Sequence, residues 1–350
     1  IASKKLSPYA EAYGQQLLSS IYWDQDNEPA ALAALTKAIE LNALPNEQHF
    51  ALIYQLAQMQ AQDEKYDQAL ATLTRWERES GNPLNADKLA LKGNIFYRLD
   101  KYQEAIDTMK AAIAASDKPN DSWNQILMAS YFELEQYDQA AQMVQASLAK
   151  NPDDIKAIKQ LAMIYIQADN YPKAIEVLAG AKSRGLITSA DDYMQLAKLY
   201  ANAEKGPEAI ATLKEGLDKG VLQPSFEVYK LQGDLCAQSD QDACAIEAYK
   251  KASPMAQDGN VDYQLGYVLI YAGRAQEARD AFASAIAKGG LRQQGEAYVL
   301  KGDAEDELGN AAAARADWQK GTTFPSSKAM ADQRLKAASA GVKMKRAPKK

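Results

Sequence analysis

The sequence has few of the residues that build most metal and catalytic sites. Its 350 residues include one histidine and two cysteines. A structural zinc site takes four cysteine or histidine ligands, and three such residues cannot supply them. No histidine or cysteine lies near His49 in the sequence, so we expect a partly exposed surface imidazole without a role in a Ser-His-Asp arrangement. The sequence therefore predicts no metal site, no cofactor and no catalytic residues, as in a protein that is not an enzyme.

Long apolar runs and an excess of positive charge are also absent. No run of 18 apolar residues occurs, so the sequence predicts no membrane span. The 40 Lys and Arg residues are outnumbered by 46 Asp and Glu, which gives a net charge of −6. A protein that binds nucleic acid by neutralising phosphates needs the opposite balance. Neither GxGxxG nor GxxxxGK[ST] occurs, so no glycine-rich phosphate loop is predicted.

Glycine and proline are sparse, at 19 and 12 residues, while helix-forming residues dominate. A short motif recurs along the chain, for example in residues 65–70 (KYDQAL) and 101–106 (KYQEAI). Its alanines are Ala31, Ala69, Ala105, Ala140, Ala174, Ala209, Ala245, Ala278 and Ala314. They are 33 to 38 residues apart, which is the period of a helical repeat array.

A second position repeats twelve residues before these alanines, from the second copy onward. It is occupied by Ala57, Gly93, Met128, Ala162, Ala197, Gly233, Gly266 and Gly302. Seven of these eight residues are small, and a small residue lets two helices approach closely. Short connections such as residues 99–101 make consecutive helices antiparallel neighbours.

Residues 91–106 (LKGNIFYRLDKYQEAI) carry both positions and resemble the tetratricopeptide repeat (TPR). The resemblance extends over about residues 28 to 325 and implies an all-α fold, a right-handed solenoid of antiparallel helix pairs. We expect a single continuous solenoid of about nine hairpins in residues 1–325, with a degenerate first copy. Residues 326–350 then form a capping helix, from Lys328 to about Ala338, and a basic tail.

The second half of the chain resembles one group of TPR proteins more closely. Basic-Gly-apolar turns at residues 184–186 and 219–221, the stretch 190–200 and the segment 288–292 carry this resemblance. They are similar to periplasmic TPR proteins associated with TonB/ExbB/ExbD-type systems of Gram-negative bacteria. The resemblance implies a periplasmic adaptor beside a TonB-like complex.

Cys236 and Cys244 lie late in one predicted helix and early in the next, with seven residues between them. A helical hairpin can bring two such Cα atoms within disulfide range, so we expect a disulfide bond. A single cysteine pair bonded in this way is typical of an oxidising compartment such as the periplasm. The alternative is two small buried thiols in a cytoplasmic protein.

In TPR proteins the first helix of each pair lines a concave face that binds partners. Positions five, nine and thirteen of one copy are Tyr263, Tyr267 and Tyr271, which share one face of a helix. The same reasoning places these further residues in or beside the groove: Tyr54, Tyr97, Phe132, Asp303, Asp306 and Glu307. Exposed tyrosines anchor interfaces, and neighbouring acidic residues favour a basic or amphipathic partner. Alternatively, the rings pack between adjacent repeats.

These observations favour a non-enzymatic scaffold of the bacterial cell envelope that binds a protein or peptide, and not nucleic acid. Two alternatives stay open. One is a cytosolic regulatory TPR protein, and the other is a cell-wall-associated regulator of an envelope enzyme. The sequence indicates neither the partner nor the oligomeric state.

Overall fold

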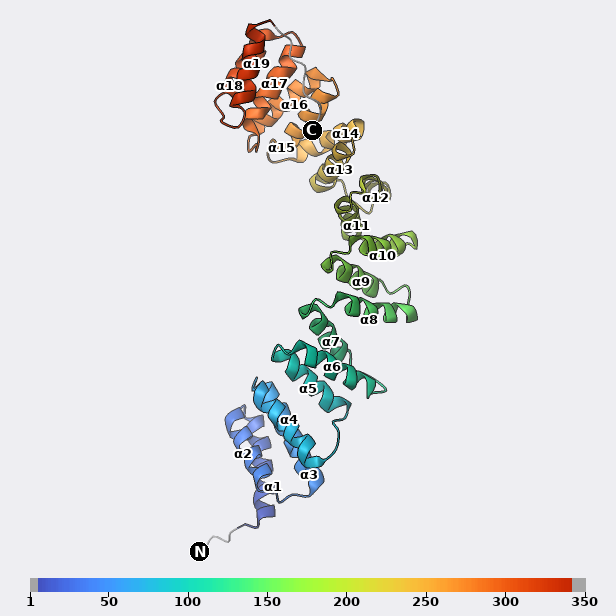
Figure 1. The fold of residues 1–350 in the computed structure, drawn as a ribbon, viewed down its shortest axis with the longest axis vertical. Coiled ribbons are helices and arrows are strands. Elements are labelled where there is room, and N and C mark those ends of the chain that lie inside the picture. The colour runs from blue at the N-terminus through green and yellow to red at the C-terminus, as the bar shows by residue number, and fades with distance from the viewer. Residues whose placement is uncertain (1–5, 342–350) are drawn as a thin grey trace. The chain divides into compact units, whose positions relative to one another are not determined.

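The structure is a computed structural model that describes residues 6–341 (Figure 1). Within these residues the chain forms nineteen α-helices, one 3-10 turn at Ser253–Met255 and no β-strand. The predicted all-α fold of helical hairpins is confirmed. None of these helices has both the length and the apolar character needed to cross a bilayer.

The chain divides into two compact units, which are described separately. The N-terminal unit, residues 1–146, contains α1 (Pro8–Asp24), α2 (Glu28–Glu40), α3 (Asn46–Gln62), α4 (Tyr66–Ser80), α5 (Ala86–Arg98), α6 (Tyr102–Ala114) and α7 (Asp121–Glu133). Helix α8 (Tyr137–Lys150) contains the boundary between the units. The continuity of residues 1–325 as one solenoid stays a prediction.

The C-terminal unit, residues 147–350, continues the alternation of first and second helices. Its helices are α9 (Ile155–Gln167), α10 (Tyr171–Ser183), α11 (Ala190–Asn202), α12 (Gly206–Asp218), α13 (Phe226–Gln238), α14 (Asp242–Ala252), α15 (Asn260–Tyr271), α16 (Ala275–Lys288), α17 (Gln294–Glu307), α18 (Ala311–Gly321) and α19 (Lys328–Ser339). Helix α19 is the predicted cap, while the predicted basic tail at residues 342–350 lies outside the described residues.

The two helices of each hairpin are joined by the same tight turn. One residue of the turn is left-handed, and the next amide bonds to the carbonyl five residues back, as from Lys101 to Phe96 at 2.9 Å. The left-handed residues are Asp26, Glu64, Asp100, Glu135, Asp169, Glu204, Asp240, Gly273 and Gly309. This bond closes the end of the first helix and directs the chain back antiparallel to it. Seven of these nine turns in the described chain therefore place a side chain where glycine is preferred.

The repeated small residue of the first helix packs against a large residue sixteen positions later on the second helix. A Cβ added at Gly266 would lie 2.8 Å from the Phe282 ring, and one at Gly302 would lie 2.6 Å from the Trp318 ring. Gly93 and Gly233 face Met109 and Tyr249 in the same way. In three other copies, Ala57, Ala162 and Ala197 stand sixteen residues before Leu73, Leu178 and Leu213, and all six residues are buried. The size of one residue therefore compensates for the size of the other within each hairpin.

Candidate functional site

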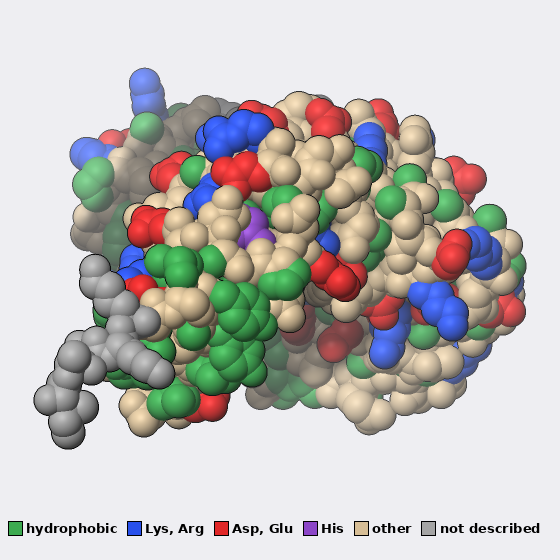
Figure 2. All heavy atoms as spheres, turned by 90° about the horizontal axis from the view of Figure 1, so that it is seen from below, with side chains coloured by type: hydrophobic (Ala, Val, Ile, Leu, Met, Phe, Trp, Pro, Cys, Tyr) green, Lys and Arg blue, Asp and Glu red, His purple; other side chains and the backbone are tan. Residues whose placement is uncertain are grey.

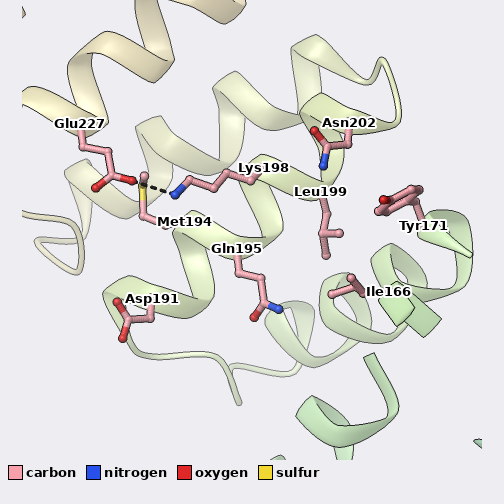
Figure 3. Close-up of a pocket in the computed structure, with 9 residues that line it drawn as sticks. All are labelled: Ile166, Tyr171, Asp191, Met194, Gln195, Lys198, Leu199, Asn202 and Glu227. Atoms are coloured by element: carbon pink, nitrogen blue, oxygen red, sulfur yellow. Dashed lines mark hydrogen bonds and ion pairs between the residues drawn. The ribbon is translucent and has the colours of Figure 1, made fainter. Parts of the chain in front are cut away.

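Two hollows lie along first helices of the C-terminal unit. The first, of about 480 Å³, is centred on α11 and bordered by the end of α9, the start of α10 and the start of α13 (Figure 3). The second, of about 570 Å³, lies between α13 and α15 and is closed by Arg292 and Gln293 before α17. Concave surfaces lined by several elements are where ligand atoms lose most water, so these hollows are the candidate site.

The residues that line the hollows follow one spacing on successive first helices. On α11 they include Met194, Lys198 and Asn202. On α13 the equivalent positions are Lys230, Asp234 and Gln238, and all three line the second hollow. Each trio occupies the repeat positions that Tyr263, Tyr267 and Tyr271 occupy on α15. The hollows therefore lie along the helix face that the repeat positions indicate, and the predicted aromatic and acidic residues included none on α11 or α13.

The three tyrosines of α15 do not share one environment. Tyr263 is only 5% exposed and packs against Phe282, with ring centres 5.9 Å apart. Burial, followed by the charge of Glu296, raises the pKa of the Tyr263 hydroxyl. Tyr267 is half-buried, lines the second hollow and lies 4.8 Å from the half-buried Tyr271 ring. The expectation of an exposed Tyr263 is therefore wrong, because this ring packs between α15 and α16, and Tyr267 is the member that lines a hollow.

The acidic residues of α17 do not line either hollow. Asp303 is 7% exposed and accepts hydrogen bonds from the Trp318 indole at 3.0 Å and from Arg334 Nε at 2.9 Å. Its expected place on an exposed acidic surface is wrong, because the guanidinium of the capping helix covers and neutralises it. Asp306 is half-buried and Glu307 is exposed.

Three predicted groove residues belong to the N-terminal unit. Tyr54 is half-buried with Lys88 Nζ 4.6 Å above its ring, and burial raises its pKa. Tyr97 and Phe132 are half-buried and pack edge-on against the tyrosines five residues later, Tyr102 and Tyr137, each at 5.6 Å. In both cases the ring pair spans the turn of its own hairpin, whereas the alternative interpretation placed the rings between adjacent repeats. Their role in partner binding stays a prediction.

Charged groups in the two hollows largely pair with each other. Lys198 donates to Glu227 at 2.7 Å, as Figure 3 shows, and Lys230 donates to Asp234 at 2.6 Å. Asp234 also accepts from the Tyr249 hydroxyl at 2.9 Å. Because these charges are mutually neutralised, the hollows present no strong field of either sign.

The remaining polar groups of the hollows are mostly side-chain amides. They belong to Gln195, Asn202, Gln238, Asn260, Gln264 and Gln293. Each amide offers two N–H donors and one carbonyl acceptor. The apolar atoms beside them come from Met194, Phe226 and Tyr267 among others. The arrangement can bind a ligand that has both donors and acceptors and some apolar surface.

Cys236 and Cys244 form a disulfide that joins α13 to α14, with Cα atoms 5.7 Å apart. Both cysteines of the chain are accounted for by this bond. Cys236 is fully buried in the core of the C-terminal unit, so the bond fixes α13, which lines the second hollow, to its own second helix.

His49 has a different environment from the one expected. It is 5% exposed, and its Nε2 lies 3.9 Å from a Glu79 carboxylate oxygen, while Nδ1 has no hydrogen-bond partner. The prediction of a surface imidazole is wrong, because this side chain is on the face of α3 that packs against α4. Among the described residues no cluster of metal-binding side chains forms around it or elsewhere.

Comparison with known proteins agrees with this architecture. The family described as a tetratricopeptide repeat-like domain matches residues 2–130, and tetratricopeptide repeat families match residues 131–185 and 263–327. The phagocyte signaling-impaired protein of Drosophila pseudoobscura pseudoobscura is 34% identical over 26% of this chain and 9% of its own length. The interferon-induced protein with tetratricopeptide repeats 2 of Cricetulus griseus is 29% identical over 30% of this chain and 22% of its own.

This chain thus spans only a small part of each relative. Among solved structures, that of Naa15/Naa10 bound to HypK-THB superposes with a TM-score of 0.51 and 12% identity. The match covers 93% of this chain and 65% of that one. A likeness at this identity concerns the fold alone.

Proposed function

The chain is a tetratricopeptide repeat protein, and from this premise we propose that its C-terminal unit binds an extended segment of a partner protein. The segment lies in the two hollows along α11, α13 and α15, and the chain performs no chemistry on it. The observation that carries the proposal is the repetition of one lining pattern on successive first helices.

An extended peptide matches the chemistry of the lining. Its backbone alternates N–H donors and carbonyl acceptors, which the side-chain amides of the hollows can bind without regard to sequence. Its side chains reach the apolar atoms of Met194, Phe226 and Tyr267. Tyr267 is the residue best suited to act as an anchor, because it is half-buried, aromatic and adjacent to the amides.

Of the two partner types predicted from the sequence, an amphipathic segment fits better than a basic one. Lysines and carboxylates pair within the hollows, and Arg334 already neutralises Asp303. A basic segment therefore gains little from long-range attraction, whereas an amphipathic one still gains from burial of its apolar side.

We propose further that the protein works in an oxidising compartment, with the periplasm of a Gram-negative bacterium as the preferred location. The Cys236–Cys244 pair and the sequence resemblance to periplasmic TPR proteins support this location. On the same resemblance, the partner belongs to a TonB-like energy-transducing complex. The cytoplasmic alternative requires both thiols to stay reduced in the cell.

The groove proposal is tested by selecting peptides from a random display library with the full chain as bait. Selected peptides are then titrated calorimetrically against wild-type protein and the Tyr267→Ala and Gln264→Ala variants. We expect Tyr267→Ala to weaken binding about tenfold to hundredfold, as for a moderate to strong interface anchor. Gln264→Ala should weaken it several-fold by removing one amide.

Gln276→Ala is the matched control, because Gln276 is an exposed glutamine on second helix α16. Equal binding by Tyr267→Ala and wild type, or equal losses in Gln264→Ala and Gln276→Ala, would contradict the groove assignment. Melting temperatures of all variants establish that a loss of binding is not a loss of folding.

A further inference from the structure

Exposed large apolar side chains gather at one helix of the described chain. Ten such residues are exposed in all, and six belong to α1 or the residues just before it. They are Leu6, Tyr9, Tyr13, Leu17, Leu18 and Ile21, with exposed fractions of 39% to 67%. In Figure 2, which views the side of the N-terminal unit that carries α1, hydrophobic side chains gather into a patch.

The patch lies on the side of α1 that faces away from its own core. Ala12 and Ser19 are buried, and Tyr22 and Trp23 pack against the core of the N-terminal unit. Tyr9, Tyr13, Leu17 and Ile21 follow a four-residue spacing, so they form a stripe about 18 Å long at 1.5 Å per residue. Among the described residues no element covers this stripe, whereas α19 covers the last hairpin of the C-terminal unit through Ala331 and Arg334.

The charges near the stripe disfavour a lipid surface as its occupant. Lys4 and Lys5 precede the patch, but residues 6–36 contain no lysine or arginine. The carboxylates of this helix are Glu11, which pairs with Lys37 at 2.8 Å, and Asp24. A helix that lies on a bilayer of anionic lipids carries basic residues on its polar face, and α1 carries acidic ones.

We propose that α1 pairs antiparallel with α1 of a second copy of this chain, across a two-fold axis near Gly14 and Gln15. The stripe contains no charged residue, so two copies bring no like charges together along it. The antiparallel direction sets Tyr9 and Tyr13 of one copy against Ile21 and Leu17 of the other. It also keeps Glu11 and the acidic end at Asp24 of one helix away from the same groups of its partner, and it opposes the helix dipoles.

Gly14 makes this approach possible at the centre of the interface. A Cβ at Gly14 would meet no atom within 4 Å, so its position is open to a second helix. The exposed part of the six side chains amounts to on the order of 500 Å² per copy, given that a full aromatic side chain buries about 150–250 Å². A pair that covers all six side chains would thus bury roughly 1,000 Å², at the lower limit of specific interfaces, where weak and reversible complexes are found.

The proposal is independent of peptide binding and is tested by sedimentation of the full chain over a concentration series. We expect wild-type protein to dimerise with a dissociation constant on the order of 10 µM. Leu17→Glu should raise this constant at least about tenfold, because it buries an unpaired carboxylate at the interface. Met163→Glu on α9 is the matched control, since Met163 is 47% exposed and Leu17 is 49% exposed, and it should dimerise as wild type does.

The antiparallel register is tested with complementary charges. Tyr13→Lys and Leu17→Glu should each weaken self-association, while an equimolar mixture should recover dimers through the new Lys–Glu contact. Both positions are exposed, so the melting temperatures should stay near that of wild type. Spin labels at Gln15 report the distance between copies independently of these substitutions.

Three results would overturn the proposal. One is a wild-type chain that stays monomeric at about 1 mM, a hundredfold above the expected dissociation constant. Another is an equal increase of the dimer dissociation constant in the Met163→Glu and Leu17→Glu variants. The third is flotation of monomeric wild type, but not Leu17→Glu, with phosphatidylcholine vesicles, which would assign the stripe to lipid.

Discussion

In the C-terminal unit, three glycines of first helices face aromatic rings across their hairpins, at Tyr249, Phe282 and Trp318. The N-terminal unit has one such glycine, Gly93, and it faces a methionine. The C-terminal unit also contains the disulfide and five ion pairs whose carboxylates are nearly buried, at Asp192, Asp262, Asp303, Glu305 and Asp317.

The N-terminal unit uses fewer such specific contacts and leaves the stripe on α1 exposed. The difference shows that two kinds of contact can hold the two helices of a hairpin in place. A hairpin is held either by generic apolar contacts or by close glycine–aromatic contacts reinforced with buried polar pairs. The second way fixes helix positions more narrowly, and the hollows lie in the unit that uses it. Five predictions test this comparison, from the largest expected effect to the smallest.

The Asp303 cluster should give the largest effect. Asp303→Ala leaves the largely buried Arg334 guanidinium and the Trp318 indole without their acceptor, so it should lower the free energy of unfolding by about 3 kcal/mol. Hydrogen exchange should show the loss in α17 to α19. Asp332→Ala, which removes an exposed pair with Lys328, should change stability by less than about 0.5 kcal/mol. Similar effects of the two variants would contradict the distinction between buried and exposed pairs.

Disulfide reduction should destabilise the α13–α14 hairpin. The Cys236–Cys244 bond closes a short loop, and its removal by Cys236→Ser with Cys244→Ser should cost about 2–3 kcal/mol on the loop-entropy model. Thermal unfolding of the double variant measures the change. A thiol titration of denatured, unreduced wild-type protein should find no free thiol, and two free thiols would contradict the bond.

The glycine–aromatic contact should respond to paired changes. Gly266→Ala pushes a Cβ into the Phe282 ring and should cost about 2 kcal/mol. Combining it with Phe282→Leu recreates the Ala–Leu pair of Ala197 and Leu213, so the double variant should be more stable than the sum of the single effects predicts. Additive losses in a denaturation cycle would show that size compensation does not hold this hairpin together.

The free energy of unfolding should depend on pH through Glu215. Hydrogen bonds from Lys182 and Lys219 lower the pKa of Glu215 from its ordinary value of 4.5 to about 2. A lowered pKa stabilises the folded state above pH 4.5, and this contribution disappears as the pH falls from 4.5 towards 2. Glu215 is about one-third exposed, so we expect Glu215→Gln to cost only about 1 kcal/mol near pH 6 and nothing near pH 2.

The matched control for Glu215 is Glu247→Gln. Glu247 is 72% exposed and pairs with Lys251 on its own helix. Its effect near pH 6 should be smaller than that of Glu215→Gln, and both effects should vanish near pH 2, as measured by urea unfolding of both variants between pH 2 and pH 6. A difference between Glu215→Gln and wild type that stays constant over this range would contradict the lowered pKa.

The smallest effect is expected at a hairpin turn of the N-terminal unit. Glu135 has a left-handed backbone with φ of 54°, and Gly309 occupies the equivalent position in the C-terminal unit. Glu135→Gly relieves backbone strain but increases the conformational entropy of the unfolded chain. The free energy of unfolding should therefore rise by about 0.5 kcal/mol. Gly309→Ala should cost about 1 kcal/mol. Calorimetric melting of both variants should show shifts of opposite sign.

Much of the fold follows from local sequence signals. The alanine period predicted the hairpins, and the twelve-residue offset located the close helix contacts. The large residue sixteen positions after each small residue is also visible in the sequence, although the prediction did not identify it as the packing partner. The left-handed turns were not recognised, because aspartate or glutamate occupies most of them and glycine only two.

The candidate site was predicted only in outline. The repeat positions predicted residues along the first helices, but burial of Tyr263 and Asp303 depends on contacts with Phe282 and Arg334, which no local pattern specifies. Likewise, a histidine with no other histidine or cysteine near it in the sequence predicts an exposed side chain, whereas His49 is buried by the neighbouring α4. Packing against elements that are distant in the sequence decides whether a side chain of a first helix is buried or exposed.

The sixteen-residue distance within each packed pair bears on how such an array grows. Both members of a pair, such as Gly302 and Trp318, lie inside one repeat period. When a repeat is duplicated or deleted, the small residue and its large partner are therefore duplicated or deleted together. A change in the size of one pair needs no compensating substitution in the next hairpin. Selection can then vary the groove residues of each copy separately, while the contact that holds the hairpin is inherited as a unit.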